Sequence, residues 1–272
     1  MRGTHSTFLV EVVVTTLAAL VSTGAVADTP FSLACQNPSF PGGPAAIDES
    51  CGAKGAGARE AAQNQVKNSF CATGSPTTLT FAQLAKWQKD VEQNKDINFG
   101  NSGPTQNRAP LKQLGEGKLV QLTAFVLVAR AEGGESVNCG HKFDQVTNKD
   151  SFHDIHISLV ATMELANPTN RVQSAANECQ GIVAEMIPHH RPVAWTADNV
   201  KRVAAAHLPV RVTGQLFFDS SHVPCAQGKP VASNPKRISL WEIHPIYAFE
   251  VCTANCDAEP TWVPLEKWAT AT

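Results

Sequence analysis

Two short segments of the sequence carry an acid and a histidine two residues apart, Asp154-Ile-His156 and Glu242-Ile-His244. Both segments lie in stretches with the composition of β-strands, where side chains at positions i and i+2 point to the same face. Imidazole and carboxylate groups are ligands that zinc and other divalent ions accept. Each pair could therefore contribute two ligands to a metal site on the face of a sheet.

Further acidic and histidine residues occur where neighbouring strands are expected to end. Glu185 ends one strand, and Asp219 and His222 follow another. A bound divalent ion would lower the pKa of a water molecule or polarise a carbonyl or phosphoryl oxygen, with Glu185 or Glu242 as the candidate catalytic base. The candidate metal ligands are Asp154, His156, His222 and His244, and the candidate cofactor is a divalent metal such as zinc.

The same groups also fit a simpler interpretation, a polar outer face or a hydrogen-bonded network without catalysis. Their spacing matches no known metalloenzyme signature, because H-E-x-x-H is absent. The chain also lacks G-x-S-x-G, a P-loop and G-x-G-x-x-G. These absences argue against serine hydrolases, nucleotide-dependent enzymes and redox-cofactor enzymes.

Two other groups of residues could contact a ligand. His189, His190 and Arg191 fall in a proline-bounded loop, where exposed side chains would form either a ligand-binding site or a solvated turn. Aromatic residues of the last two expected strands could stack on a base or a sugar, although alternating aromatic residues more often face the core. These residues are Phe217, Phe218, Trp241 and Tyr247.

The elements that must position these residues are five expected strands and one helix. The strands cover 118–130, 152–160, 180–186, 210–218 and 238–251, and the helix covers 195–207, between the third and fourth strands. This order is that of the OB-fold, a five-stranded Greek-key barrel, and Gly214 stands where the fourth strand of such barrels carries a glycine. Another small barrel, or an antiparallel sheet packed on helices, would also fit.

The expected fold is thus mainly β with helices: an OB-like five-stranded barrel preceded by a helical, cysteine-bearing N-terminal extension. We expect a signal peptide over 1–27, the extension over 28–110, the barrel over 111–256 and a C-terminal tail over 257–272. Helices are expected at 58–70 and at 80–91, the second opened by the capping-box pattern Thr80-x-x-Gln83. The segment 94–108 is expected to be a loop.

The N-terminal residues have the layout of a signal peptide. Arg2 and His5 precede an apolar stretch over 12–21, and Ala25-Val26-Ala27 offers a cleavage site. The apolar stretch is too short to span a bilayer, and Glu11 stands directly before it, so we expect no transmembrane anchor after processing. An uncleaved anchor is the alternative to a secreted or periplasmic location.

All eight cysteines follow that cleavage site, and an even number in an exported chain predicts up to four disulfides of open connectivity. Zinc binding through sulfur is disfavoured, because the chain has no C-x-x-C pair. A formal net charge of -2 gives no basic field for nucleic acid, and the partner stays unknown. The cysteines are Cys35, Cys51, Cys71, Cys139, Cys179, Cys225, Cys252 and Cys256.

Four short sequence segments resemble those of a group of exported bacterial proteins of undescribed activity. The resemblance extends over about 80–252. It implies export and an OB-like core, and it implies no catalytic residue. The segments are Gly134-Glu-Ser-Val-Asn-Cys139, Asp154-Ile-His-Ile157, Glu185-Met-Ile-Pro-His189 and Trp241-Glu-Ile-His-Pro245.

These features favour an exported, disulfide-stabilised binding or interaction module whose ligand is unknown. The lack of a complete catalytic signature and the binding face that OB barrels present both support this interpretation. A divalent-metal-dependent hydrolase is the first alternative, and a structural protein of the cell envelope is the second. Whether the chain is an enzyme stays open. The hydrolase would use Asp154, His156, Glu185, Glu242 and His244.

Overall fold

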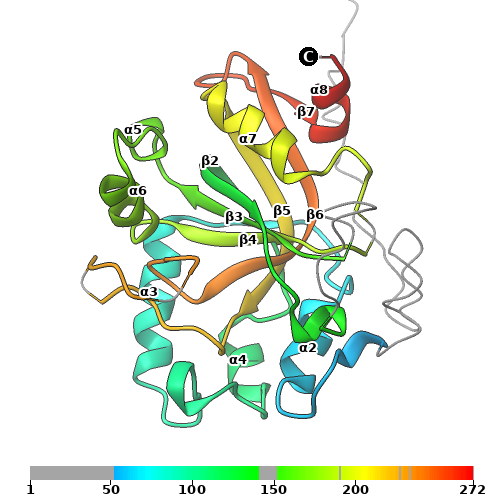
Figure 1. Ribbon diagram of the computed structural model, residues 1–272, viewed down its shortest axis with the longest axis vertical. Coiled ribbons are helices and arrows are strands. Elements are labelled where there is room, and N and C mark those ends of the chain that lie inside the picture. The colour runs from blue at the N-terminus through cyan, green and yellow to red at the C-terminus, as the bar shows by residue number, and fades with distance from the viewer. Residues whose placement is uncertain (1–51, 141–151, 190, 227, 233, 272) are drawn as a thin grey trace, which may run out of the picture.

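The computed structural model describes residues 52–140, 152–189, 191–226, 228–232 and 234–271, which form a mixed α/β fold around a closed five-stranded barrel (Figure 1). Around the barrel the strand order is β2-β3-β4-β6-β5, and β5 pairs with β2 to close it. Neighbours in this ring are antiparallel except β4 and β6, which are parallel. The expected OB-like barrel is confirmed. Its strands are β2 (Leu119–Ala131), β3 (Ile155–Val160), β4 (Ile182–Met186), β5 (Pro209–Phe218) and β6 (Trp241–Ala254).

Helix α7 (Ala197–Ala205) lies between β4 and β5, as the OB pattern predicts. The Thr196 side chain caps its first turn by accepting a hydrogen bond from the backbone N–H of Asn199. Val200 and Val203 are fully buried, and the helix packs against β2. A strong apolar stripe at helical spacing therefore fixes this helix to the barrel.

Helices precede the barrel in the chain, as expected. The capping box at Thr80 is present, with the Gln83 side chain accepting from the Thr80 backbone N–H. The helix expected over 58–70 is shorter in the structure, and β1 pairs in parallel with β2. The elements are a 3₁₀ helix Gly52–Lys54, α2 (Ala61–Lys67), β1 (Thr77–Thr78), α3 (Phe81–Glu92), a 3₁₀ helix Gly100–Ser102 and α4 (Ala109–Leu114).

Several short elements were not predicted. Three lie between β2 and β4: a 3₁₀ helix Ser136–Asn138, α5 (Met163–Ala166) and α6 (Arg171–Glu178). The segment expected as a tail contains β7 (Thr261–Pro264), which pairs with β6, and α8 (Leu265–Ala271). Leu265 and Trp268 of α8 are buried, so this segment packs on the barrel.

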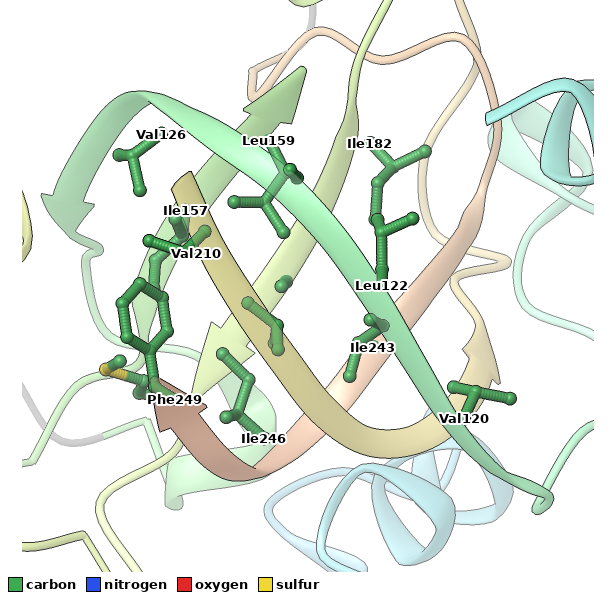
Figure 2. Packing of buried hydrophobic residues seen from close by; sticks show 14 of the residues in the cluster. Val120, Leu122, Val126, Ile157, Leu159, Ile182, Val210, Ile243, Ile246 and Phe249 are labelled. Atoms are coloured by element: carbon green, nitrogen blue, oxygen red, sulfur yellow. The ribbon is translucent and has the colours of Figure 1, made fainter. Parts of the chain in front are cut away.

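The barrel interior is apolar and fixes which side chains point outward. Ile157 of β3 lies opposite Ala184 of β4, and Ala184 lies opposite Ile243 of β6. All three belong to the central hydrophobic core, in which Figure 2 labels Ile157 and Ile243. Because side chains alternate along a strand, the residues beside these three point to the outer face of the barrel.

Disulfides join Cys179 to Cys225 and Cys252 to Cys256. Cys71 and Cys139 are also disulfide-bonded. In the part of the chain that the structure describes, no helix is long and apolar enough to cross a membrane. The expected signal peptide over 1–27, with its cleavage site, and the segment 28–51 lie outside the described residues.

Candidate metal centre

The β-sheet register brings the acid and histidine residues of three strands together on the outer face. His156 of β3 lies opposite Glu185 of β4. The parallel pairing of β4 with β6 then places Glu242 and His244 on the other side of Glu185. All four side chains are buried, with Glu242 and His244 fully so. The polar face expected from alternation exists, but it is not a solvated surface.

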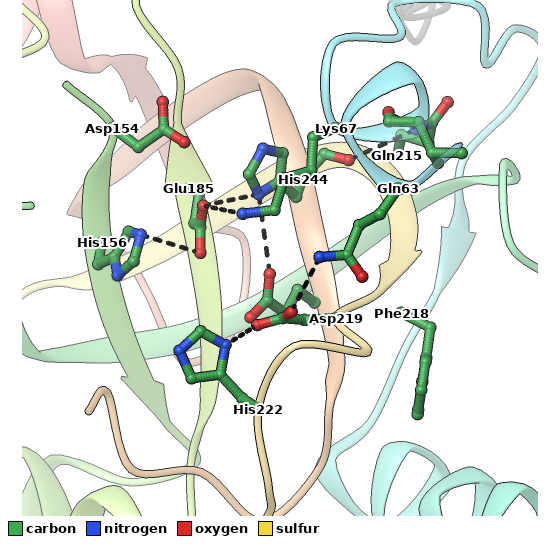
Figure 3. A network of polar contacts seen from close by, with 12 residues as sticks. Gln63, Lys67, Asp154, His156, Glu185, Gln215, Phe218, Asp219, His222 and His244 are labelled. Carbon is green, nitrogen blue, oxygen red and sulfur yellow. Dashed lines mark hydrogen bonds and ion pairs between the residues drawn. The ribbon is translucent and has the colours of Figure 1, made fainter. Parts of the chain in front are cut away.

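Glu185 is the centre of this arrangement (Figure 3). Its Oε1 lies 3.1 Å from Nε2 of His156, and its Oε2 lies 2.7 Å from Nδ1 of His244. The Lys67 ammonium lies 3.8 Å from the same Oε2. One buried carboxylate therefore contacts two imidazoles and one cation.

A first group of metal-ligating side chains gathers around His156. Glu135 Oε1 lies 3.1 Å from Nε2 of His156. Asp154 lies nearby and accepts a 3.0 Å hydrogen bond from Asn138 Nδ2. One ligand atom from each of Glu135, Asp154, His156 and Glu185 can be chosen so that all lie within 4.8 Å of one another. Such spacing is compatible with one divalent ion.

A second group shares Glu185 and lies on β6. Ligand atoms of Glu185, Glu242 and His244 also lie within 4.8 Å of one another. Glu242 Oε2 is 3.7 Å from Nδ1 of His244, while its other oxygen, Oε1, pairs with Arg237. Arg237 in turn contacts Asp219 at 3.2 Å. One oxygen of Glu242 is thus held by arginine and the other faces the histidine.

Several polar atoms in the cluster have no hydrogen-bond partner of acceptable geometry among the described residues. They include both ring nitrogens of His156 and of His244. They also include Oε2 of Glu185 and of Glu242. Nearby oxygens approach the imidazoles closely without lying along an N–H direction. Buried polar atoms of this kind need a partner such as a bound water molecule or an ion, because leaving them unsatisfied is costly.

Helix α2 is hydrogen-bonded to the barrel and brings Lys67 to the cluster. Gln63 donates a 2.7 Å hydrogen bond to the Ser221 hydroxyl, and its side-chain oxygen accepts from the Ser220 backbone. Gln215 of β5 donates to the carbonyl of Val66 at 2.9 Å. These contacts bind the helix to the barrel and hold Lys67 over Glu185.

Burial and charge move the ionisation of the central groups in opposite directions. Burial alone would raise the pKa of Glu185, but the charges of His156 and Lys67 outweigh it and hold that pKa well below its usual range. Burial, together with Glu135 and Glu185, raises the pKa of Asp154 to about 8. Near neutral pH, Glu185 is therefore ionised and Asp154 is largely protonated.

The pKa values of His156 and His244 are shifted in opposite directions. Burial would lower the pKa of His156, but Glu185, Glu132 and Glu135 raise it well above its usual value. Burial dominates at His244 and lowers its pKa. Without an ion, the first imidazole is the charged one and the second is neutral, so protons and Lys67 supply the positive charge that the buried carboxylates need.

The structure brings together five of the residues that the sequence singled out, namely Asp154, His156, Glu185, Glu242 and His244. His222 lies outside both groups and contacts Asp219 instead. It keeps 29 % of its side chain exposed. Asp219, directly after β5, is joined to Glu242 through Arg237, so His222 is linked to the second group only through other side chains.

In the proline-bounded loop, the two described candidates, His189 and Arg191, are not exposed as was expected. His189 is only 2 % exposed. Arg191 donates hydrogen bonds to the carbonyls of His153 at 2.8 Å and Met186 at 3.1 Å. His190 lies outside the described residues. The expectation of exposure was wrong for His189, because the loop folds back onto the ends of β3 and β4.

The aromatic residues of β5 and β6 do not form an exposed stacking surface. Phe218 and Trp241 belong to the central core, with ring centroids 5.1 Å apart. Phe217 is fully buried on the outer face, and its ring lies 5.3 Å from that of His244. Tyr247 is buried and accepts a hydrogen bond from the Ala72 backbone. Base or sugar stacking on these rings is therefore not supported.

Three residues of the site were not singled out from sequence. Glu135 follows β2. It lies in one of the four segments that carry the resemblance, and no other sequence feature pointed to it. Lys67 ends α2, and Arg237 precedes β6. Both residues reach the cluster through tertiary contacts alone. Their positions in the sequence therefore gave no link to the acid–histidine pairs.

No protein-family model, curated protein or solved structure matches the chain. These comparisons therefore give no support to the resemblance to exported bacterial proteins that four sequence segments suggested. What stands of that expectation is the five-stranded mixed barrel itself.

Proposed function

We propose that this protein is an exported, disulfide-stabilised binding module whose ligand is a divalent metal ion of the zinc type, held on the outer face of its barrel. The observation that carries the proposal is the buried Glu185 carboxylate between His156 and His244. Carboxylate and imidazole from neighbouring strands are a typical ligand set for such ions.

The charges around Glu185 support a cation as the ligand. Buried acids in this region outnumber buried basic side chains, and a surplus of buried carboxylates needs protons or cations. Protonated Asp154 and His156 supply part of that charge without an ion, and a divalent ion would replace those protons. The acids are Asp154, Glu185, Asp219 and Glu242, and the cations that contact them are Lys67 and Arg237.

The position of the cluster on the barrel also supports a binding role. In OB-folds the face formed by the second and third strands, with the loops beside it, commonly binds the ligand. Here these strands are β3 and β4, which carry His156 and Glu185. The loop after the first strand contributes Glu135, and the loop before the last contributes Arg237.

The export part of the proposal rests on the N-terminal pattern and the disulfides. Disulfides persist in oxidising compartments. We expect the mature chain to begin at Asp28, after cleavage following Ala27. Intact-mass measurement on protein recovered from the periplasm or medium tests this, and a chain that retains its first 27 residues in the membrane fraction would contradict it.

The metal is tested by elemental mass spectrometry on purified, untagged protein, together with melting curves measured with and without a chelator. We expect stoichiometric zinc or a similar ion and a lower melting temperature in chelator. Glu185→Gln should abolish ion binding. Glu250→Gln, on the same strand as His244 but paired with Arg211, is the matched control and should retain it.

The purely structural interpretation makes the opposite prediction. If the cluster is only a hydrogen-bonded network, the protein should purify without metal and melt at the same temperature with and without chelator. Glu185→Gln would then lower the melting temperature equally with and without added zinc. That combination of results would overturn the proposal.

A further inference from the structure

We propose that the cluster holds two divalent ions, with Glu185 bridging them. This inference rests on the proposed function and deepens it. The first ion would be bound by Glu135, Asp154, His156 and one oxygen of Glu185. The second would be bound by the other oxygen of Glu185 with Glu242 and His244.

The two oxygens of Glu185 already serve different strands. Oε1 faces His156 on β3 at 3.1 Å, and Oε2 faces His244 on β6 at 2.7 Å. A carboxylate with one imidazole at each oxygen has the arrangement of a bridging ligand between two metal ions. Such ions lie roughly 3.5–4 Å apart in two-metal sites.

The second position has its own unsatisfied ligands. Nδ1 of His244 and Oε2 of Glu242, 3.7 Å apart, have no hydrogen-bond partner of acceptable geometry among the described residues, although both side chains are fully buried. An ion at the first position would not satisfy them, because that group contains neither residue. These atoms therefore indicate a second ligand.

The charges of the two groups match two ions. Together they contain four carboxylates, which equal the charge of two divalent ions when both histidines are neutral. The carboxylates are Glu135, Asp154, Glu185 and Glu242. Arg237, which pairs with Glu242, is itself matched by Asp219. Lys67 lies 3.3 Å from Glu135 and 3.8 Å from Glu185, both carboxylates of the first group.

The first experiment titrates metal-free protein with Zn²⁺ and, separately, with Mn²⁺. We expect two zinc ions per chain by elemental mass spectrometry after removal of free metal. With Mn²⁺ we expect an electron paramagnetic resonance spectrum of two spin-coupled ions, because a shared carboxylate holds them close together. Neither readout depends on a variant that could fail to fold.

Single substitutions then assign the two positions. His244→Gln should reduce the stoichiometry from two ions to one and remove the spin coupling, and His156→Gln should do the same from the other side. His207→Gln is the matched control, because His207 is exposed and lies outside both groups. It should retain two coupled ions.

The outcomes separate this inference from the proposed function. One uncoupled ion per wild-type chain would overturn the two-ion centre and leave metal binding in place. No bound ion would overturn both. Two ions that survive in both His156→Gln and His244→Gln would place them elsewhere and would also overturn the bridging role of Glu185.

Discussion

The Lys67 ammonium lies 3.8 Å from Oε2 of Glu185, the oxygen that also contacts His244. Burial would lower the pKa of this lysine, but Glu135 and Glu185 outweigh that effect and raise it. The side chain is therefore charged at any ordinary pH. Helix α2 thus places a positive charge beside the carboxylates of Glu135 and Glu185.

The first prediction concerns competition between this ammonium and a metal ion. Lys67→Met removes the positive charge and keeps much of the apolar stem. We expect divalent ions to bind at least tenfold more tightly, about 1.4 kcal/mol, because the ion no longer approaches a fixed like charge. Isothermal titration calorimetry with Zn²⁺ measures the change.

Lys201→Met, on the exposed face of α7, is the control for a lost surface charge, since Lys201 pairs only with Asp198 among the ion pairs of the described residues. Its zinc affinity should equal that of the wild type. Equal affinity in Lys67→Met as well would show that the ammonium does not compete with the ion.

The second prediction uses Tyr247, the single tyrosine of the chain. Its hydroxyl donates to the Ser69 carbonyl at 3.1 Å and accepts from the Ala72 backbone, and its ring stacks on Phe70 at 5.2 Å. Burial raises the pKa of its phenol above the ordinary value of 10.0, against a small opposing effect of the Ala72 hydrogen bond. Tyr247 therefore ties the segment after α2 to β6.

We expect no phenolate absorbance from the folded protein at pH 10 to 11, whereas the denatured chain should titrate near pH 10. The raised pKa means that the folded state favours the neutral phenol. This contribution to stability is complete below pH 10 and is lost as the pH rises toward the folded-state pKa. Ultraviolet absorbance with parallel circular dichroism makes the measurement. Phenolate at pH 10 in a still-folded protein would contradict it.

The barrel could be predicted from sequence because its signals are local. Alternating apolar residues mark each strand, and the stripe that includes Val200 and Val203 marks α7. The same alternation correctly placed His156 and Glu242 on polar strand faces. The strands β7 and β1 escaped prediction, because such short strands owe their stability to pairing with β6 and β2 rather than to their own pattern.

The candidate site could be predicted only in part. The two acid-x-His pairs were visible, yet whether they meet depends on the parallel register of Ala184 with Ile243, which no local pattern specifies. The contact of α2 with the site was likewise not specified by any local pattern, so Lys67 was missed. His222 was included because it follows β5 closely, but it pairs with Asp219 and belongs to neither group.

The third prediction concerns the disulfide between Cys179 and Cys225. It links the end of α6 to the loop that leads to Arg237, across a separation of 46 residues. The double variant Cys179→Ala/Cys225→Ala should lower the free energy of unfolding by roughly 4 kcal/mol, because the unfolded chain regains the entropy of a long loop. Denaturant unfolding followed by circular dichroism measures it.

Cys252→Ala/Cys256→Ala is the comparison, since that bridge closes a separation of only 4 residues. Loss of this bridge should lower the free energy of unfolding by roughly 2 kcal/mol, because the loop that it closes is short. A larger loss for the short bridge than for the long one would show that loop entropy does not govern these disulfides.

The fourth prediction tests a close contact between β5 and β6 at Gly214. A Cβ atom added there would lie 2.4 Å from the carbonyl oxygen of Pro245 and 2.7 Å from Cγ2 of Ile243. The register of β5 with β6 shifts on both sides of this residue, so the strands bend together at this point. Only glycine leaves room for that approach, which explains the glycine in the fourth strand of the barrel.

Gly214→Ala should therefore lower the free energy of unfolding by about 1–3 kcal/mol, since backbone atoms must move to accommodate the methyl group. Gly133→Ala is the matched control, because a Cβ atom there meets nothing within 4 Å. Its stability should equal or slightly exceed that of the wild type. Because Ile243 lies between Glu242 and His244, Gly214→Ala should also weaken zinc binding. Unchanged stability in Gly214→Ala would mean that β5 and β6 do not approach this closely in solution.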